Sequence, residues 1–297
     1  MVELRHCSPA PDVRLFAKLE GFNPTGSVKD RIVRAMLLAA QAEGRLGAGD
    51  TVIEASTGNT GIALAMVGRA MGHDVRIVMP ENVFPEIPRA IAVYGATLEW
   101  VPGDEGVRRA IEVARHQAER EGWFFLDQFC NPHNVRAHYE TTAVEILEDV
   151  PHVDAFVAGL GTGGTVMGVG RRLKEANPET RVVAVEPHPG NQLQGLKSLA
   201  DGFIPPILDL DFLDGKILVR SYHAFRAAAE LMQREAIFGG ISSGAVLHAG
   251  RKVAQRLGRG NIVLLFADNG WKYLGTNLWL SPPDPGEGEE LDDTIWW

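Results

Sequence analysis

The sequence lacks most features that mark secreted, membrane and nucleic-acid-binding proteins. It has only two cysteines, Cys7 and Cys130, whose separation does not suit a metal site, so we expect free thiols in a reducing compartment. No apolar run approaches the length of a membrane span, and the first residues do not read as a signal peptide. The net charge is −9 and no basic run is present, which argues against nucleic-acid partners. We therefore expect a cytoplasmic protein without nucleic-acid or membrane partners.

The chain does contain a regular alternation of short apolar strands with helices of ten or more residues. Its 297 residues, 45% hydrophobic and 23% charged, suffice for two ordinary domains. The alternation predicts the α/β class, with parallel sheets covered by helices on both faces. We predict two α/β domains that meet near residues 129–135, with a ligand between them. The expected strands are 2–5, 13–20, 51–55, 75–79, 97–101, 123–127, 153–158, 181–186, 216–220 and 261–267, and the expected helices are 27–43, 62–71, 86–94, 105–121, 134–148, 165–176, 222–235 and 245–257.

The end of the chain differs from the rest. Residues 281–297 are rich in proline, glycine and acidic residues and finish on Ile295-Trp296-Trp297. This composition predicts an acidic extended tail and not a third domain. Two tryptophans would be costly to leave in water, so we hypothesise that the tail end packs into a groove.

Residues 23–31, Asn-Pro-Thr-Gly-Ser-Val-Lys-Asp-Arg, contain the first candidate catalytic group. A turn at Pro24 and Gly26 precedes an apolar helical pattern, and Ser27 with Asp30 suggests a capping box. Lys29 then lies in the first turn of a helix, where the dipole disfavours its ammonium form. A neutral lysine amine is what Schiff-base chemistry requires, although this stretch taken alone favours an ordinary surface lysine.

Three glycine-rich loops at predicted helix starts are candidate ligand sites. Gly159-x-Gly161-x-x-Gly164, with Glu186 at the end of the next strand, matches a dinucleotide-binding fingerprint. The hydroxyls of Thr162 and Thr165 favour a terminal phosphate monoester instead.

The other two loops suit different ligand groups. Ser56–Gly61 offers N–H groups and hydroxyls that suit a carboxylate, and Gly240–Gly244 offers a serine that could meet a heterocyclic nitrogen. Helix capping is the plain alternative at both. Together with a Schiff-base lysine and a phosphate cup, these loops match pyridoxal 5′-phosphate carrying an amino acid.

In this combination the chain resembles the cysteine synthase/cystathionine β-synthase family of fold-type II pyridoxal-phosphate enzymes, and is most similar to its cysteine synthase B branch. The resemblance covers residues 2 to about 280. It implies two parallel-sheet α/β domains of the tryptophan synthase β type, with the cofactor in the cleft between them. The implied division is a large domain of 1–29 plus 132–280 and a small mobile domain of 30–131. The motifs that carry it are Asn23–Arg31, Ser56–Gly61, Gln128–Pro132, His138-Tyr139, Gly159–Thr165, Gly240–Ala245 and Asp268–Leu274.

The resemblance also implies a role for each matching residue. Lys29 would bond to pyridoxal 5′-phosphate and act as catalytic base, Asn59 would face the ring's 3′ oxygen, and Ser242 would meet the pyridine nitrogen. Lys197 could contact an acidic or phosphorylated substrate, or it could be a solvated loop lysine. The implied phosphate-binding residues are Gly161, Thr162, Gly163, Gly164 and Thr165, and the implied substrate-carboxylate residues are Ser56, Thr57, Thr60 and Gln128.

The implied reaction is β-replacement: O-acetyl-L-serine loses acetate through an aminoacrylate, and sulfide adds to give L-cysteine. O-phosphoserine as substrate, a thiocarboxylate carrier as sulfur source, and cystathionine synthesis are open alternatives within the family. A silent regulatory protein on this fold is the alternative of another class. The resemblance implies a homodimer, with serine acetyltransferase or a sulfur-carrier protein as further partners, and no metal.

Overall fold

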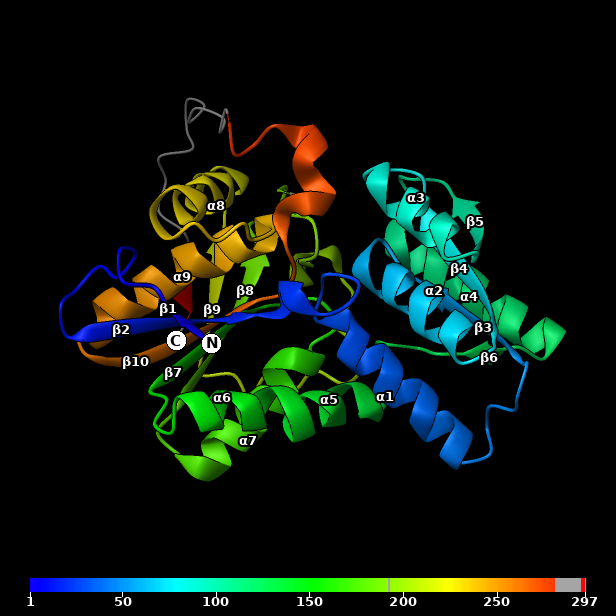
Figure 1. The fold of residues 1–297 in the computed structure, drawn as a ribbon, viewed down its shortest axis with the longest axis horizontal. Helices are drawn as coiled ribbons and strands as arrows, with labels where there is room; N and C mark the ends of the chain where they lie inside the picture. The colour runs from blue at the N-terminus through cyan, green and yellow to red at the C-terminus, as the bar shows by residue number, and fades with distance from the viewer. Residues whose placement is uncertain (192, 281–294, 297) are drawn as a thin grey trace.

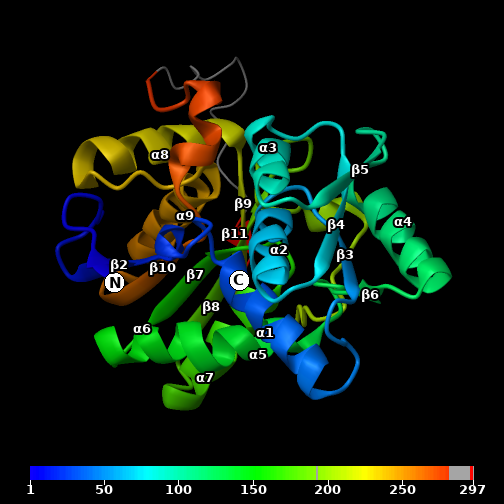
Figure 2. The same cartoon turned by 45° about the vertical axis from the view of Figure 1, so that its right-hand side comes forward.

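The computed structural model describes residues 1–191, 193–280 and 295–296, which form two β-sheets with helices packed around them. Figure 1 shows the larger sheet with both chain ends on the left and the smaller sheet on the right. Helix α1 runs between these two bodies (Figures 1 and 2). The two-domain α/β architecture expected from the sequence is confirmed.

The larger sheet has seven strands in the order β1-β2-β10-β7-β8-β9-β11. Its five central strands are parallel, and β1 and β11 pair antiparallel at the edges. The bounds are β1 Val2–Glu3, β2 Val13–Leu19, β7 Ala155–Gly159, β8 Arg181–Pro187, β9 Gly215–Val219, β10 Gly260–Phe266 and β11 Ile295–Trp296.

Both faces of this sheet are buried, because successive residues of each strand face opposite helical layers. Along β7, Ala155 and Val157 pack with α8 and α9, while Phe156 and Ala158 pack with α6 and α7. Helices α8 and α9 lie above the sheet in Figure 1, and α5, α6 and α7 lie below it. The bounds are α5 Pro132–Ala137, α6 Ala143–Asp149, α7 Gly164–Ala176, α8 Ser221–Glu235 and α9 Ile241–Leu257, with short helices η1 Glu20–Phe22, η3 Leu199–Asp201 and η4 Gly270–Thr276.

The smaller sheet has four parallel strands in the order β5-β4-β3-β6. Helices α1, α2 and α3 cover one face, and α4 covers the other. The bounds are β3 Thr51–Ala55, β4 Asp74–Pro80, β5 Thr97–Val101, β6 Phe124–Phe125, α1 Lys29–Ala42, α2 Asn59–Ala70, α3 Glu86–Val93 and α4 Gly106–Glu121.

Two local expectations were wrong. Helix α1 begins without a capping box, because Asp30 accepts from the backbone N of Thr25 at 2.8 Å and from its hydroxyl, and does not reach back to Ser27. The expected helix 134–148 is interrupted by one π-helical turn, η2 His138–Thr142. Such turns are often found at functional sites.

The last described residues form an edge strand. Ile295 pairs with Ile217 and Trp296 with Lys216 of β9, so the end of the chain covers that edge of the larger sheet. Residues 281–294 of the predicted acidic tail lie outside the described part of the chain. Among the described residues, no helix combines the length and apolar character needed to cross a bilayer.

Candidate active site

Lys29 occupies the first position of α1, and its half-buried side chain faces a cavity between the two sheets. Burial lowers the pKa of Lys29 to about 8, and the nearby Asp268 charge opposes that shift. From the sequence we expected the helix dipole to disfavour the ammonium form, whereas in the structure the pKa is lowered mainly by desolvation. Lys29 is therefore not an ordinary surface lysine, and its neutral form is much more accessible near neutral pH than that of a solvated lysine.

The three glycine-rich loops meet at this lysine. The loop after β3, the loop after β7 and the start of α9 all contribute to the cavity wall. Of the residues predicted from the sequence, Gly164 alone does not line it, because it packs behind the loop against Asn134. The predicted residues on the cavity wall are Lys29, Ser56, Thr57, Asn59, Thr60, Gln128, Gly161, Thr162, Gly163, Thr165, Lys197 and Ser242.

The loop before α7 forms a cup at the helix N-terminus. Gly163 has a φ of +88°, a left-handed conformation that glycine adopts without strain. A Cβ at Gly164 would lie 1.9 Å from Asn134 Oδ1, so only glycine fits there. The Thr162 hydroxyl accepts from Asn134 Nδ2 at 3.1 Å, which leaves its own hydrogen for a ligand.

A buried histidine stands behind this cup. His138, on the π-helical turn, contacts the Thr165 hydroxyl through Nε2 at 3.1 Å and the Thr142 hydroxyl through Nδ1 at 3.0 Å. Burial lowers its pKa to about 3, with further lowering by the Lys29 and Arg31 charges. The imidazole is therefore neutral and orients the Thr165 hydroxyl.

The Ser56–Gly61 loop is closed by its own serine. Ser56 Oγ accepts from the backbone N of Gly58 at 3.1 Å and of Gly61 at 2.9 Å. Thr60 Oγ1 donates to Gln128 Oε1 at 2.6 Å, so these two predicted substrate residues contact each other. This arrangement holds the loop rigid at the start of α2.

Beneath this loop lies a buried carboxyl group. Glu54 accepts from the backbone N of Gln128 at 3.2 Å. Its burial, with Asp127 nearby, raises the pKa of Glu54 to about 8. The carboxyl group is therefore largely protonated at neutral pH and adds little negative charge beneath the Ser56–Gly61 loop.

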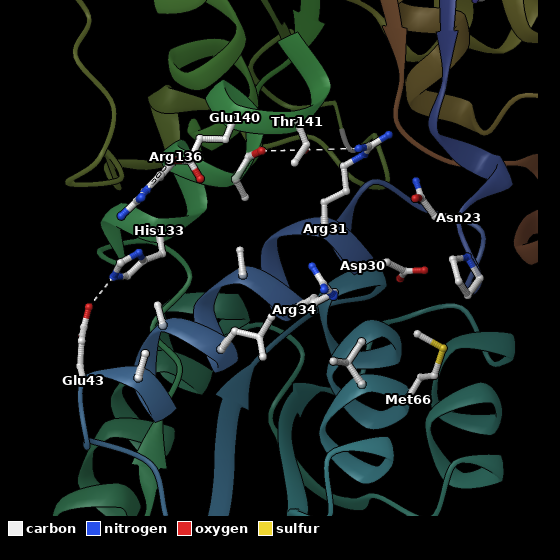
Figure 3. A pocket seen from close by; sticks show the side chains of 17 residues that line it. Asn23, Asp30, Arg31, Arg34, Glu43, Met66, His133, Arg136, Glu140 and Thr141 are labelled. Carbon is white, nitrogen blue, oxygen red and sulfur yellow. Dashed lines mark hydrogen bonds and ion pairs between the residues drawn. The ribbon is translucent and has the colours of Figure 1, made fainter. Parts of the chain in front are cut away.

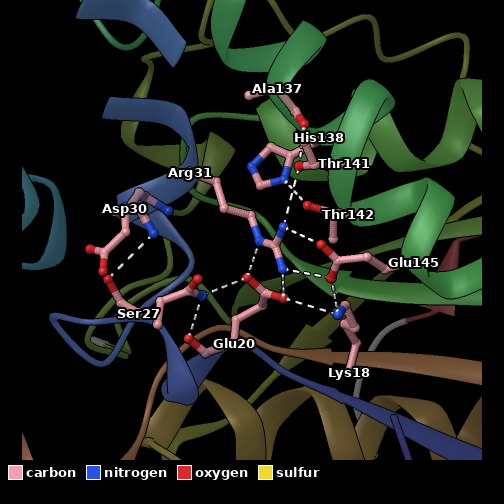
Figure 4. Close-up of polar contacts among 12 residues, drawn as sticks. Lys18, Glu20, Ser27, Asp30, Arg31, Ala137, His138, Thr141, Thr142 and Glu145 are labelled. Atoms are coloured by element: carbon pink, nitrogen blue, oxygen red, sulfur yellow. Dashed lines mark hydrogen bonds and ion pairs between the residues drawn. The ribbon is translucent and has the colours of Figure 1, made fainter. Parts of the chain in front are cut away.

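Arg31 anchors the start of α1 to the larger domain (Figure 4). Its guanidinium donates to Glu20 at 2.6 and 3.0 Å and to both Glu145 oxygens at 2.7 Å. Lys18 also binds Glu145, so two cations and two carboxylates balance in a partly buried cluster. This cluster fixes the backbone that carries Lys29.

A larger cavity, about 620 Å³, lies on another side of α1 and is separate from this site (Figure 3). Two polar pairs lie on its rim: Arg136 binds Glu140 at 2.6 Å and His133 contacts Glu43 at 2.9 Å. Lys29 and the three loops do not line it.

Several contributing residues were not assigned roles from the sequence. Asn134, Glu54 and His138 act from behind the loops, and the sequence signal for His138 was limited to its place in a family motif. Glu186, the acidic residue of the apparent dinucleotide fingerprint, binds Lys216 at 2.7 Å and accepts from Leu199 N at 2.6 Å. The acidic residue that the dinucleotide interpretation requires is therefore already paired within the protein.

The geometry fits pyridoxal phosphate. A helix N-terminus with two threonine hydroxyls suits a phosphate dianion, and Ser242, 4% exposed at the start of α9, offers a neutral hydroxyl to the cavity. Asn59 Oδ1 is buried there without a protein partner, as expected of an atom reserved for a ligand. A partly neutral lysine completes the donor set.

The fold and site define a class: two-domain α/β enzymes that hold a cofactor between a buried lysine and a phosphate cup. A profile of the family described as "Pyridoxal-phosphate dependent enzyme" matches residues 1–268. The cysteine synthase of Aquifex aeolicus (strain VF5) is 44% identical over 289 residues, covering 94% of this chain and 88% of that protein. This chain belongs to the pyridoxal-phosphate dependent enzyme family.

Solved structures agree with this assignment. The crystal structure of O-ureido-L-serine synthase is 37% identical with a TM-score of 0.89, covering 96% of this chain and 93% of that one. The crystal structure of cysteine synthase from Entamoeba histolytica is 35% identical with a TM-score of 0.87, and the match covers 96% of this chain and 89% of that chain.

Proposed function

We propose that this chain is a cysteine synthase, a pyridoxal-phosphate dependent transferase that makes L-cysteine from O-acetyl-L-serine and sulfide. The convergence of Lys29 with the phosphate, carboxylate and serine loops on one cavity carries the proposal. The cysteine synthase identity of the relative that covers most of the chain supports it.

We assign the residues as follows. Gly161–Thr165 and α7 bind the cofactor phosphate, Ser242 meets the pyridine nitrogen, Asn59 meets the ring oxygen, and the Ser56–Thr60 loop with Gln128 binds the substrate carboxylate. When bound, pyridoxal phosphate supplies an electron sink for negative charge at the substrate Cα.

Lys29 is the general base of this scheme. Its amine removes the proton from the substrate Cα, and with a pKa near 8 it exchanges that proton readily at neutral pH. Acetate then leaves from Cβ and sulfide adds there, after which Lys29 returns the proton to Cα. The loop at Ser56 keeps the carboxylate in place through both half-reactions.

We propose that strands β1, β2 and β7–β10 of the larger sheet belong to a large domain, residues 1–29 plus 132–280, and that the four-stranded sheet belongs to a small mobile domain, residues 30–131. Strand β11 comes from the tail, residues 281–297. The bond from Gln194 Nε2 to the carbonyl oxygen of Thr57, at 3.0 Å, links the two domains across the site. We further propose a cytoplasmic homodimer, which light scattering of the purified protein would contradict if it gave a monomer mass.

The direct test uses purified protein with pyridoxal phosphate. It should be yellow, lose that absorption band when O-acetylserine is added, and form cysteine when sulfide follows. Lys29→Ala should abolish turnover. A protein that binds no cofactor would contradict the enzyme proposal and favour a silent binding protein.

Lys197 supports O-phosphoserine as a second candidate substrate. It lines the cavity, and its Nζ lies 5.5 Å from the centre of the Phe129 ring. If Lys197 binds the substrate phosphate, Lys197→Gln should lower kcat/KM for O-phosphoserine about tenfold or more, since a charged hydrogen bond is lost. The loss with O-acetylserine should stay within about threefold. Equal losses for both would refute this role.

A further inference from the structure

Asp268 lies where the three functional loops meet. It follows β10, and its backbone forms a bridge with Ser27, two residues before Lys29. Its carbonyl oxygen accepts from the backbone N of Gly240 at 3.0 Å, at the start of the segment that carries Ser242. The backbone on both sides therefore fixes where its carboxylate lies.

The carboxylate is 3% exposed and contacts the cofactor site through a single oxygen. Asp268 Oδ2 accepts from Asn59 Nδ2 at 2.8 Å and from the Tyr273 hydroxyl at 2.5 Å. Burial, with the Asp268 charge, raises the pKa of Tyr273, so that hydroxyl remains a donor. A Cβ at Gly240 would lie 2.0 Å from Asp268 Oδ1, so glycine is required for the carboxylate to fit.

These contacts determine which way the Asn59 amide faces. A carboxylate oxygen only accepts hydrogen bonds, so the amide must present its nitrogen to Asp268. The flipped amide would place two acceptors in contact in a buried site, which is costly. Asp268 accepts one hydrogen of this nitrogen, the Asn59 side chain also contacts the Tyr273 hydroxyl, and Asn59 Oδ1 has no protein partner.

We propose that Asp268 is a positioning residue for the cofactor: it holds the Asn59 amide by its nitrogen and so fixes how the amide faces the ring oxygen. This inference rests on the proposed contact between Asn59 and the cofactor ring. None of the roles implied by the family resemblance involves Asp268.

The charge of Asp268 serves the same site. Lys29 and Tyr273 line the cavity, and the Asp268 charge acts on the pKa of each, while the Lys29 and Arg31 charges lower the pKa of His138. Asp268 is the negative charge that favours the protonated form of the buried Lys29 nitrogen. A carboxylate here therefore acts on both the ring oxygen, through Asn59, and the lysine.

The test is a double-mutant cycle on the holoenzyme. The variants are Asp268→Ala, Asn59→Ala and both together, with pyridoxal-phosphate affinity and the visible absorption spectrum as readouts. If Asp268 acts through Asn59, each single variant should weaken cofactor binding about tenfold or more and shift the spectrum, because a hydrogen bond to a charged group is lost. The double variant should resemble Asn59→Ala alone.

Two further variants separate positioning from folding. Asp268→Asn keeps an acceptor for Asn59 and should restore affinity to within about threefold of wild type, even if Asp268→Ala folds poorly. Tyr273→Phe removes the other donor to the same oxygen but leaves Asp268 to hold Asn59, so it should shift the spectrum less than Asp268→Ala does.

Independent, multiplicative losses in the cycle, or a wild-type spectrum and affinity in Asp268→Ala, would overturn the inference while leaving the cysteine synthase proposal standing. A wild-type protein that neither binds the cofactor nor forms cysteine would overturn both.

Discussion

Replacing Lys29 by methionine should stabilise the cofactor-free protein near neutral pH, although it removes the catalytic base. The pKa of Lys29 is lowered from 10.5 to about 8 because the folded protein desolvates its ammonium. Protonated Lys29 therefore opposes folding. Methionine has a similar length and no charge, so it removes this opposition with little change in packing.

The magnitude follows from proton linkage. A pKa that is lower in the folded state costs stability at low pH, and the cost disappears as pH rises from the folded value towards the unfolded one. A shift of this size corresponds to about 3 kcal/mol at pH 7 and less than about 1 kcal/mol at pH 10.5. Lys29→Met should gain that stability at pH 7 and lose its advantage as the pH approaches 10.5.

Urea unfolding of both cofactor-free proteins between pH 6 and 10.5 provides the measurement. The diagnostic quantity is how the difference in free energy of unfolding between the two proteins changes with pH. Packing changes add a constant to that difference, and the other titrating groups are common to both proteins. A difference that does not change with pH would show that the Lys29 ammonium is solvated in the folded protein, and would refute the argument.

Two further predictions concern the residues around this lysine. Arg31→Met removes the guanidinium that Glu20 and Glu145 share and should lower the free energy of unfolding by about 3 kcal/mol. Arg34→Met, at an exposed position on the same helix, should change that free energy by less than about 0.5 kcal/mol. Similar effects of the two variants in urea unfolding would contradict the anchoring role of Arg31. Gly164→Ala places a Cβ 1.9 Å from Asn134 Oδ1 and should lower the free energy of unfolding by about 1–3 kcal/mol, with weaker retention of the cofactor. Adding Asn134→Ala to this variant should recover part of the thermal stability. No recovery would show that the clash lies elsewhere.

The sequence predicted what depends on local pattern. The turn at Pro24 and Gly26 with the apolar pattern after it placed Lys29 in the first turn of a helix, where the structure has it. Alternation of strands and helices predicted both parallel sheets, because short apolar runs mark buried strands and the helices between them have a 3.6-residue period.

What the sequence could not provide was the set of partners brought together by folding. Asp30 accepts hydrogen bonds from Thr25, and Arg31 pairs with Glu145, which is 114 residues away. The π-helical turn at His138 lies where α7 approaches closely: a Cβ at Gly168 would lie 2.3 Å from the carbonyl oxygen of Val135. No single-segment pattern encodes such an approach.

The same principle explains why Lys29 looked ordinary within its own segment. Its lowered pKa comes from burial, which requires the loops after β3 and β7 and the start of α9 to close around it. Those loops also bring polar atoms without protein partners into the cavity, such as Asn59 Oδ1. Buried polar atoms of this kind are unfavourable when no ligand is bound. On the proposed assignment the cofactor would contact the buried lysine and the unpartnered polar atoms of this cavity together, so cofactor binding should stabilise the fold more than its contact area alone implies.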